Sequence, residues 1–559
     1  MHYINFNMIK KISNFINFNK SIIFLVFIAY FILGFLIYKD YGFYTDEKFH
    51  RSNGFFWLTY IADFFGLEKL KLSSAIKMSE IQGFTLPDIE LWNKYGIIFD
   101  LPAAYLEILL ELDEPLKYYQ LRHILIFIYF FIGSIFFYKI LLNRFKNKII
   151  SLLGLFLLII TPRIFGDSFW NNKDIIFLSL YIISIYYYFK VIDNPSNKNI
   201  ILLSLFAGIS TTIRFAGFFI PLSLIFFWLI NFVSNKKDLN FSLVLKHLIS
   251  YFFFLFIFWP YLWGNTFAGI IGSFNFDMAW NGKVNFLGEY YHSNKLPYYY
   301  LGFWILVSTP ILHLLLFFHG FSAYSLRVIG RFFKIKKDSI YNDLWRAKEE
   351  KKDFFIFINL VFFFTGLSLL NISLYNSWRL AYFLYIFIIY FSTLSIYFYF
   401  KKYKNKKFIN ISLILCFIIL ATSIILRIYI YHPYQSFYFN FLTTKKIKNN
   451  LDVDYTGLSA IEFLREVIKN EKGNHEIIVS TNSWYPLWFM HDLLDANEKK
   501  RIKIIVNDEK ANADYVYSNR VYNIDKRYYK KYDMPSIFKK IREHKVDNTI
   551  IYEIYKKSK

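Results

Sequence analysis

The sequence lacks several features on which nucleotide-dependent enzymes and transporters rely. Its one cysteine, Cys416, lies inside an apolar run, which excludes an intramolecular disulfide and a cysteine-based metal site. A glycine-rich phosphate loop of the Walker or Rossmann pattern is absent, so nucleotide binding on the cytoplasmic side has no support. An internal repeat is also absent, whereas transporters usually consist of two related halves.

Long hydrophobic runs are abundant instead. Of 559 residues, 56% are hydrophobic and 23% are aromatic. Residues 22–38 and 354–370 are close to the ~20 apolar residues that cross a hydrocarbon core as a helix. The first run follows a basic N-terminus without a small-residue cleavage site, which is typical of an uncleaved anchor. The composition therefore predicts a membrane protein with many spans.

The net charge of +24 is distributed unevenly. Segment 401–407 holds five lysines and no acid, and segment 319–353 holds nine basic against five acidic residues. Segment 40–120 reverses this balance, with thirteen acids against seven bases. Basic loops stay cytoplasmic under the positive-inside rule, so the excess charge indicates topology. We therefore expect no nucleic-acid partner.

The apolar runs and the basic loops together predict an all-α polytopic membrane protein with about eleven transmembrane helices. An odd number puts the N-terminus in the cytoplasm and the C-terminus on the outer side. The third and fifth spans look too short to cross a membrane alone. The spans are expected near residues 22–39, 121–141, 149–161, 174–191, 199–213, 215–231, 247–263, 298–318, 354–371, 379–400 and 408–427.

Two long segments are expected outside the membrane. Residues 40–120 contain amphipathic stretches such as 55–66, which predict one or two helices lying along the outer surface. After residue 428 the pattern changes to that of a small α/β domain. Its expected elements are a helix over 457–470 and strands over 476–481, 502–506 and 548–555.

The sequence Tyr44-Thr45-Asp46-Glu47 places two adjacent carboxylates a few residues after the first span. A carboxylate within reach of an acceptor hydroxyl takes up its proton as the oxygen attacks, so the pair is a candidate for a catalytic base. The alternative is a solvated surface pair, which is the common situation of neighbouring acids. Their position at the membrane surface favours the catalytic interpretation.

The chain resembles the GT-C superfamily of integral-membrane glycosyltransferases, in particular the bacterial protein O-mannosyltransferase and lipid A aminoarabinose transferase branch. Those enzymes carry an acidic pair in the first external loop, and Asp46-Glu47 match it. The order and spacing of further phrases support the resemblance. These phrases lie at 96–103, 161–174, 208–221, 296–310, 374–383, 432–440 and 454–459.

The resemblance implies a sugar donor carried on a polyprenyl phosphate, a lipid, glycan or protein acceptor, and contact with membrane lipids. It also implies that Asp46 is the general base, that Glu47 orients the acceptor or its partner residues, and that Arg379 contacts the donor phosphate. The departing phosphate is a stable anion and needs no general acid, so cations suffice to hold it.

Basic residues at predicted outer boundaries of the membrane are candidates for this phosphate site. Arginine forks two donors onto phosphate oxygens, and a guanidinium at membrane depth is costly without such a partner. For Arg379 the alternative is an interfacial arginine whose charge reaches the membrane surface beside Trp378. The candidates are Arg379, Arg214, Arg163 and Lys173.

Acidic, histidine and aromatic residues are candidates for the sugar or acceptor pocket, namely Asp100, Asp167, His50, His292 and Tyr299. Asp100 and Asp167 are also candidate ligands of a divalent cation, and the sequence suggests no other cofactor. A histidine metal site would require distant loops to converge, and the alternative for His50, His123 and His292 is an interfacial location. Asp174 stands at the start of a span and fits a helix cap.

These interpretations predict a cytoplasmic N-terminus over 1–21, a GT-C membrane domain over 22–427 and a periplasmic α/β domain over 428–559, in a bacterial inner membrane. The expected activity is that of an inverting glycosyltransferase, a hexosyl- or pentosyltransferase, which moves a sugar from a polyprenyl-phosphate donor to an acceptor on the outer face. Three alternatives stay open: an oligosaccharyltransferase or polymerase of related architecture, a transporter or flippase of lipid-linked sugars, and a non-catalytic scaffold.

Overall fold

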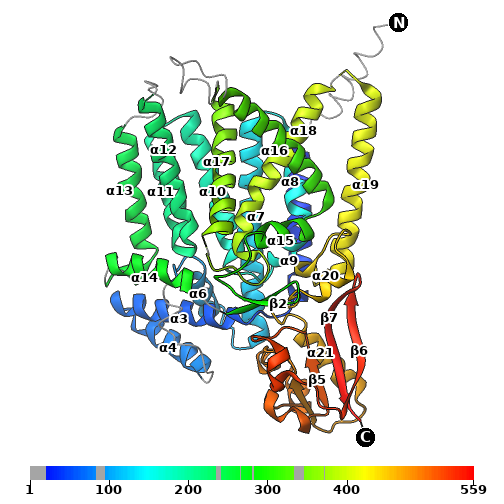
Figure 1. Cartoon of the computed structure of the whole chain (residues 1–559). Helices are drawn as coiled ribbons and strands as arrows, with labels where there is room; N and C mark the ends of the chain where they lie inside the picture. Colours follow the sequence, from blue (N-terminus) through cyan, green and yellow to red (C-terminus); the bar gives the residue numbers. More distant parts are fainter. Residues whose placement is uncertain are drawn as a thin grey trace.

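A bundle of long helices forms one end of the molecule and a small sheet domain the other in the computed structural model (Figure 1). The structure describes residues 20–82, 95–233, 241–264, 266–279, 282–332, 345, 347–370, 372–403 and 405–558. Within these residues the chain is mostly helical, which confirms the predicted fold class of a polytopic helical protein with a small C-terminal α/β domain.

Each of the predicted spans coincides with helical structure. Seven helices of the described residues are long and apolar enough to cross a membrane, and three further apolar helices have 10–17 residues. The predicted short third and fifth spans are indeed short, because α8 has 12 residues and α11 has 17. The bundle helices are α2 (Lys20–Ile37), α7 (Pro115–Phe145), α8 (Lys148–Ile159), α10 (Asp174–Asp193), α11 (Asn197–Ile213), α12 (Phe219–Val233), α13 (Phe241–Ile257), α15 (Tyr300–Ser308), α16 (Ile311–Phe332), α17 (Lys348–Leu369), α18 (Tyr385–Lys402) and α19 (Lys407–Tyr431).

The span expected as one helix over 298–318 is broken. Helix α15 ends at Ser308 and α16 begins at Ile311, because Pro310 has no N–H to continue the helical ladder. The side-chain amide of Asn440 donates to the carbonyl oxygens of Leu306 at 2.6 Å and of Thr309 at 2.9 Å. The break is thereby satisfied by the segment that follows the last span, and α16 extends beyond the predicted end to Phe332.

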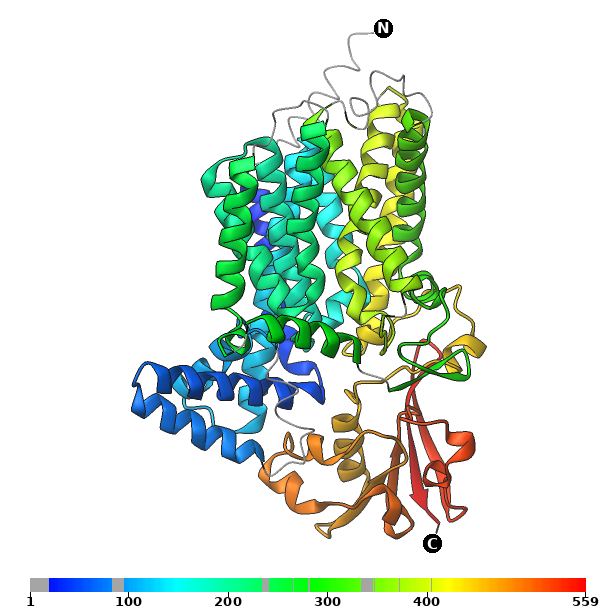
Figure 2. The same cartoon turned by 60° about the vertical axis from the view of Figure 1, so that its left-hand side comes forward.

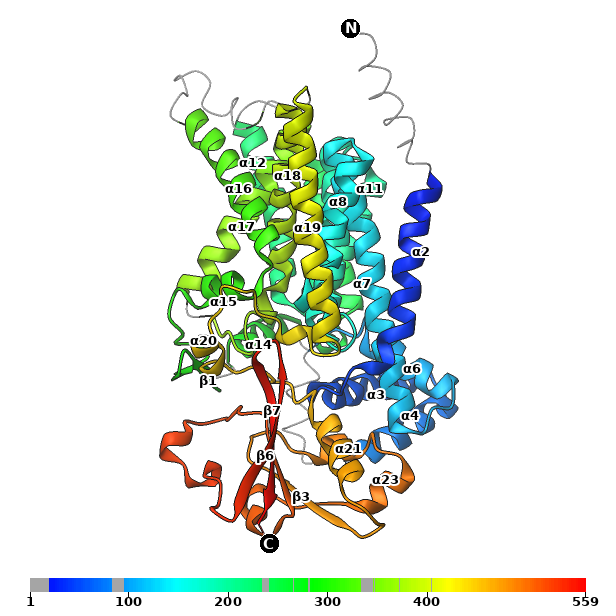
Figure 3. The same cartoon turned by 90° about the vertical axis from the view of Figure 1, so that its right-hand side faces the viewer.

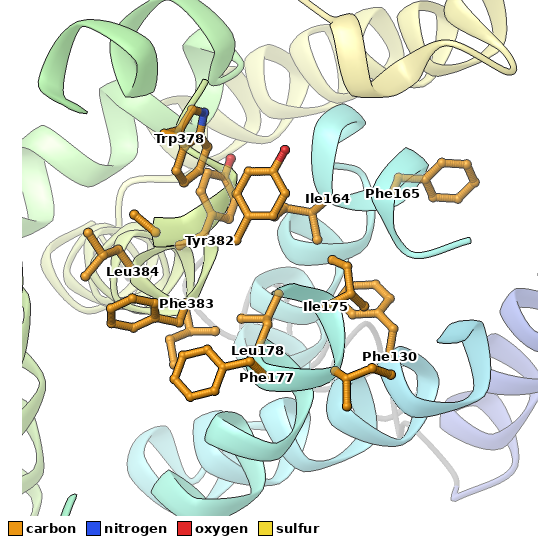
Figure 4. Packing of buried hydrophobic residues seen from close by; sticks show 14 of the residues in the cluster. Phe130, Ile164, Phe165, Ile175, Phe177, Leu178, Trp378, Tyr382, Phe383 and Leu384 are labelled. Carbon is orange, nitrogen blue, oxygen red and sulfur yellow. The ribbon is translucent and has the colours of Figure 1, made fainter. Parts of the chain in front are cut away.

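Helices α10 and α18 form the centre of the bundle. In the 18-residue windows that identify them as spans, 78% and 89% of the residues are buried, against 17% for α2 and 11% for α19. Aromatic side chains fill the space around the outer ends of α10 and α18, where Trp378, Tyr382 and Phe383 approach Phe177 and Ile164 (Figure 4). Dense packing therefore fixes these two helices at the end that faces the C-terminal domain.

Helices of the loop after the first span lie across the end of the bundle together with α14 (Thr266–Ala279) (Figure 2). One or two such helices were expected, and the described residues of this loop form three, namely α3 (Asp46–Phe64), α4 (Glu68–Gln82) and α6 (Asp100–Leu109). The guanidinium of Arg51 donates to both carboxylate oxygens of Glu107, with Nε at 3.0 and 3.1 Å. This buried pair joins α3 to α6, so the loop forms a fixed layer rather than a loose connection.

The C-terminal domain contains one five-stranded sheet in the order β4-β3-β5-β7-β6, with β4, β3 and β5 parallel and β7 and β6 antiparallel. The predicted helix and three predicted strands are present as α21, β3, β4 and β7. Two strands were missed: β5 has only four residues, and β6 has the highly charged sequence FKKIREHKV with most of its side chains outside the core. The elements are α20 (Lys445–Asn449), α21 (Ala460–Asn470), α22 (Trp488–His491), α23 (Ala496–Arg501), β3 (Ile477–Thr481), β4 (Ile502–Ile504), β5 (Tyr515–Ser518), β6 (Phe538–Val546) and β7 (Thr549–Lys557).

The contacts between the C-terminal domain and the membrane domain include three that lie far apart on the small domain. The β6–β7 ribbon extends toward the end of α19 (Figure 3), where Asp547 at its turn pairs with Arg427. On another side, Lys48 of α3 pairs with Asp492. A hairpin of β1 (Lys283–Phe286) and β2 (Glu289–His292) meets the chain at Leu451. These contacts hold the C-terminal domain against the end of the helix bundle.

A close crossing of α16 and α18 provides a test of this packing. A Cβ atom built at Gly320 would lie 2.0 Å from the carbonyl oxygen of Phe391, so Gly320→Ala requires the two helices to separate. We expect it to lower the free energy of unfolding by about 1–3 kcal/mol. The measurement is thermal unfolding of the purified protein in detergent, followed by tryptophan fluorescence.

The matched control is Gly330→Ala on the same helix. No described atom lies within 4 Å of a Cβ built at Gly330, so this change is expected to be neutral or to stabilise by up to about 1 kcal/mol. Equal melting temperatures for the two variants would contradict the close crossing.

Candidate active site

A cavity of about 610 Å³ lies between the C-terminal domain and the end of the bundle that faces this domain. It has the volume of a site for a small organic ligand. Four separate parts of the chain line it, and they include Tyr44, Asp46 and Phe49 of the first loop, Lys283 of β1, Tyr375, Asn376 and Arg379 before α18, and Asp452, Tyr455, Trp484, Trp488 and Tyr522 of the C-terminal region.

Asp46 faces this cavity from the first residue of α3. The helix N-terminus favours a negative charge at this position. The Tyr44 hydroxyl donates to Asp46 Oδ2, and Arg379 Nη2 lies 3.6 Å from the same oxygen. Burial raises the pKa of Tyr44 well above its usual value, so its hydroxyl remains a donor. These two contacts hold the Asp46 side chain beside the cavity.

Glu47, the second member of the acidic pair, points away from the cavity and is fully buried. Its Oε1 accepts a hydrogen bond of 3.0 Å from the backbone N–H of Tyr44. Its Oε2 lies 3.2 Å from Nε2 of His123 in α7. Glu47 therefore connects the start of α3 to the bundle, and this connection fixes the direction of the neighbouring Asp46 side chain.

Arg379 reaches the cavity from a short helical turn, η5 (Arg379–Leu384), that precedes α18. The two residues Asn376 and Ser377 have positive φ angles of 54° and 63°, a conformation that is costly for side-chain-bearing residues. The Tyr300 hydroxyl holds this turn by donating to the Ser377 carbonyl at 3.0 Å. The guanidinium of Arg379 lies 5.1 Å from the ring centre of Tyr44. The backbone is therefore held in a strained turn that directs Arg379 into the cavity.

Asp174 is the carboxylate behind Arg379. Its Oδ2 lies 3.5 Å from Arg379 Nη1, and its Oδ1 accepts a hydrogen bond from Arg214. The helix-cap interpretation of Asp174 is wrong, because its side chain caps no backbone N–H and holds two arginines instead. Arg214 and Asp174 do not line the cavity, and Asp174 connects Arg214 to the cavity residue Arg379.

Three other candidate residues gather at a separate, small cavity of about 20 Å³. His50 Nδ1 lies 3.0 Å from Asp100 Oδ2, which also accepts from Asn53 at 2.8 Å. Lys173 lines the same small cavity, with its ammonium 3.2 Å from the ring centre of Tyr95. His50, Asp100 and Lys173 thus meet, but beside the large cavity rather than in it.

The remaining candidates lie away from the large cavity. Arg163 is buried, donates to the Tyr438 carbonyl at 3.0 Å and stacks near Trp304. Asp167 is fully buried, which raises its pKa to about 7. His292 ends β2, and Tyr299 is exposed near Phe286. None of these four lines the 610 Å³ cavity.

Several cavity residues were not expected from the sequence. Trp484 and Trp488 belong to a run WYPLW in the C-terminal domain, and two tryptophans close together in a polar surface loop were a usable signal. Asp452 and Lys283 carried no such signal, because only the folded chain brings their segments to the cavity. Among the described residues, no three His, Cys, Asp or Glu side chains are grouped so as to hold a metal ion.

Residues 121–263 match the family of dolichyl-phosphate-mannose-protein mannosyltransferases. This match indicates a membrane glycosyltransferase of the GT-C superfamily. Comparison with curated protein sequences finds no match to this chain.

Comparison with solved structures finds an oligosaccharyltransferase and ArnT, both at low sequence identity to this chain. The oligosaccharyltransferase of Archaeoglobus fulgidus in the apo form is 11% identical with a TM-score of 0.43, and the alignment covers 76% of this chain and 62% of that protein. ArnT from Cupriavidus metallidurans is 9% identical in its apo state, with a TM-score of 0.47 and coverage of 96% of this chain and 98% of ArnT. For ArnT bound to undecaprenyl phosphate the identity and coverage are the same and the TM-score is 0.44.

Asp452 allows the environment of the cavity to be tested by pH. Burial raises its pKa to about 7, so the folded protein keeps a proton there that the unfolded chain releases near pH 4. Stability must then fall as the pH rises from about 4 to about 7. Relative to wild type, Asp452→Asn is expected to gain about 3 kcal/mol between pH 5 and pH 8, measured by chemical unfolding.

The matched control is Asp508→Asn, which removes an exposed carboxylate of the same domain. Its stability relative to wild type should not depend on pH in this range. A pH dependence shared by both variants would show that Asp452 is not the buried acid.

Proposed function

We propose that this protein transfers a sugar from a polyprenyl-phosphate donor to an acceptor at the outer face of the membrane, with inversion at the anomeric carbon. One observation carries the proposal. The carboxylate of Asp46 and the guanidinium of Arg379 lie 3.6 Å apart, and both face the cavity of about 610 Å³ between the bundle and the C-terminal domain. The match to mannosyltransferases that use a lipid-phosphate sugar supports the donor class.

The proposed reaction is one in-line displacement. The acceptor hydroxyl oxygen attacks the anomeric carbon and its proton passes to the carboxylate of Asp46. The bond from the anomeric carbon to the phosphate oxygen breaks, and both of its electrons leave with the polyprenyl phosphate. Because the leaving group is already a stable anion, a general acid is not needed.

Arg379 is the proposed ligand of the departing phosphate, and Lys283, which also lines the cavity, is the proposed second cation. Arg214 acts as a positioning residue, because it orients Asp174 and through it Arg379. Arg163 is proposed to stabilise the fold, since its guanidinium is already held by a carbonyl and two aromatic rings.

The C-terminal domain is proposed to complete the site by covering it. Trp484 and Trp488 present aromatic surfaces to the cavity, and such faces stack on sugar rings. Covering the cavity also excludes water, which competes with the acceptor for the donor sugar. The domain over 428–559 is therefore proposed to belong to the catalytic unit. In the proposed topology this domain lies on the periplasmic side of a bacterial inner membrane, and the N-terminus lies in the cytoplasm.

Asp46→Asn tests the proposed base. It keeps the shape of the side chain but removes the proton acceptor, so transfer of labelled sugar from polyprenyl-phosphate donors should fall at least ~100-fold. The assay uses purified protein with membrane lipid and protein fractions as acceptors, and melting temperature confirms that the variant is folded.

Asp63→Asn is the matched control, since Asp63 is an exposed residue of the same helix that pairs with Lys71. It should transfer sugar at the wild-type rate. Undiminished transfer by Asp46→Asn would show that the protein is an enzyme in which Asp46 is not the base. A product with retained anomeric configuration would contradict single displacement.

Arg379→Gln tests the phosphate site. Loss of a charge-assisted hydrogen bond costs about 1.5–3 kcal/mol, so kcat/KM for the donor should fall about 10- to 100-fold. Arg379→Lys should recover only part of this loss, because an ammonium lacks the planar fork of a guanidinium. Steady-state kinetics with varied donor concentration measures both, with exposed Arg465→Gln as the control, and a donor kcat/KM unchanged in Arg379→Gln would overturn the assignment.

A further inference from the structure

Tyr44 lies between the two side chains to which the proposed function assigns the chemistry. Its hydroxyl donates to Oδ2 of Asp46, and its ring centre lies 5.1 Å from the guanidinium carbon of Arg379. All three side chains line the cavity of about 610 Å³. One tyrosine therefore contacts the proposed base with its polar end and the proposed phosphate ligand with its aromatic face.

The guanidinium of Arg379 depends on aromatic rings for its orientation. Its contacts with carboxylates are long, 3.6 Å to Asp46 and 3.5 Å to Asp174. Its Nε is buried and has no hydrogen-bond partner among the residues that the structure describes. The ring centres of Tyr44 and Tyr375 lie 5.1 and 5.4 Å from the guanidinium carbon, within the range in which a cation is attracted to a ring face. The two rings thus hold a group that its long ion pairs leave loosely bound.

The hydroxyl of Tyr44 sets the direction of the Asp46 carboxylate. The Asp46 side chain is 25% exposed at the start of α3, so packing alone does not fix it. A hydrogen bond to a carboxylate is stronger than one between neutral groups. Burial raises the pKa of Tyr44 well above its usual value, so the hydroxyl keeps its proton and does not compete as a base. Arg379 approaches the same oxygen, Oδ2, and Oδ1 is left for the acceptor.

Tyr44 is itself held firmly by the protein. The residue is buried, and its ring meets that of Trp170 edge to face with 5.1 Å between the ring centres. Its backbone N–H donates to Oε1 of Glu47 at 3.0 Å, and its carbonyl accepts from the N–H of Glu47 at 3.0 Å. Trp170 in turn donates to the hydroxyl of Ser436 at 3.1 Å. A side chain fixed in this way can fix the groups that it contacts.

We propose that Tyr44 is a positioning residue that holds the base and the phosphate ligand at a set separation, the base through its hydroxyl and the ligand through its ring. The inference rests on the proposed function and deepens it. When a donor phosphate binds Arg379, the Tyr44 hydroxyl stays on Oδ2 of Asp46. Oδ1 then takes the proton of the acceptor hydroxyl as its oxygen bonds to the anomeric carbon.

Tyr44→Phe tests the hydroxyl, because it keeps the ring and removes the donor to Asp46. In sugar transfer by the full-length protein in detergent, kcat should fall about tenfold, the effect of one lost hydrogen bond. The Kd for farnesyl phosphate, a short polyprenyl phosphate, should stay within about twofold of wild type, since the ring remains on Arg379. Isothermal titration measures this Kd, and the melting temperature confirms that the variant is folded.

Tyr41→Phe is the matched control. It removes another buried tyrosine hydroxyl of the same segment, one that donates to Oε1 of Gln435 at 3.1 Å, and Tyr41 does not line the cavity. Its kcat and its Kd for farnesyl phosphate should stay within about twofold of wild type, even where loss of the hydrogen bond lowers the melting temperature. An unchanged kcat in Tyr44→Phe, or an equal fall in both variants, would overturn the role of the hydroxyl.

Tyr44→Met tests the ring, because it keeps an apolar side chain and removes the aromatic face. Its Kd for farnesyl phosphate should lie about fivefold above that of Tyr44→Phe, since Arg379 loses one of its two rings. Tyr44→Leu should show the same rise, which separates loss of the ring from an effect of the methionine sulfur. Equal Kd values for the folded Phe, Met and Leu variants would overturn the role of the ring.

The two readouts separate this inference from the proposed function. If wild type transfers no sugar from any donor, the proposed function fails, and the role of the hydroxyl in transfer fails with it. Binding of farnesyl phosphate needs no turnover. The binding series therefore decides by itself whether the ring of Tyr44 positions Arg379 for a phosphate.

Discussion

The carboxylate of Asp174 is the point on which the arrangement of the site depends. It stands at the outer end of α10, one of the two most buried helices, and binds Arg379 at the outer end of the other, α18. Its other oxygen is engaged by Arg214, so one buried acid stands against two arginines. Such a cluster keeps a net positive charge at the floor of the cavity. A buried positive charge is costly unless a further anion balances it. Asp46, 3.6 Å from Arg379, is the second carboxylate that the described residues place beside this arginine.

The cavity exists because segments far apart in the sequence close over this floor. Lys48 of the first loop pairs with Asp492 of the C-terminal domain, and the ammonium lies 5.2 Å from the ring centre of Trp488. The β1–β2 hairpin meets the chain at Leu451 on the other side. The membrane domain therefore supplies Asp46 and Arg379, and the C-terminal domain supplies the two tryptophans. Neither part encloses the space alone, which explains why a single sequence motif does not describe the site.

The sequence predicted those parts of the fold that depend on local pattern. Hydrophobic runs located helical structure at each predicted span, and short apolar runs located the strands β3, β4 and β7. It missed the break at Pro310, because the apolar run continues through it, and it missed β6, whose polar sequence is stabilised by pairing with β7. In the site, Asp46 and Arg379 were named in advance, and the structure brings them to one cavity. Asp452 and Lys283 were not, since their proximity is produced by long-range packing. The distance of Tyr299 and His292 from the cavity also could not be read from chain order.

The proximity of Asp46 and Arg379 has a consequence for the order of substrate binding. Without substrate, the two side chains neutralise one another. On the proposed function, a donor phosphate that binds Arg379 competes with Asp46 for the same positive charge. Donor binding then releases the Asp46 carboxylate from its partner, so this carboxylate meets an acceptor hydroxyl only where a sugar is ready to receive it.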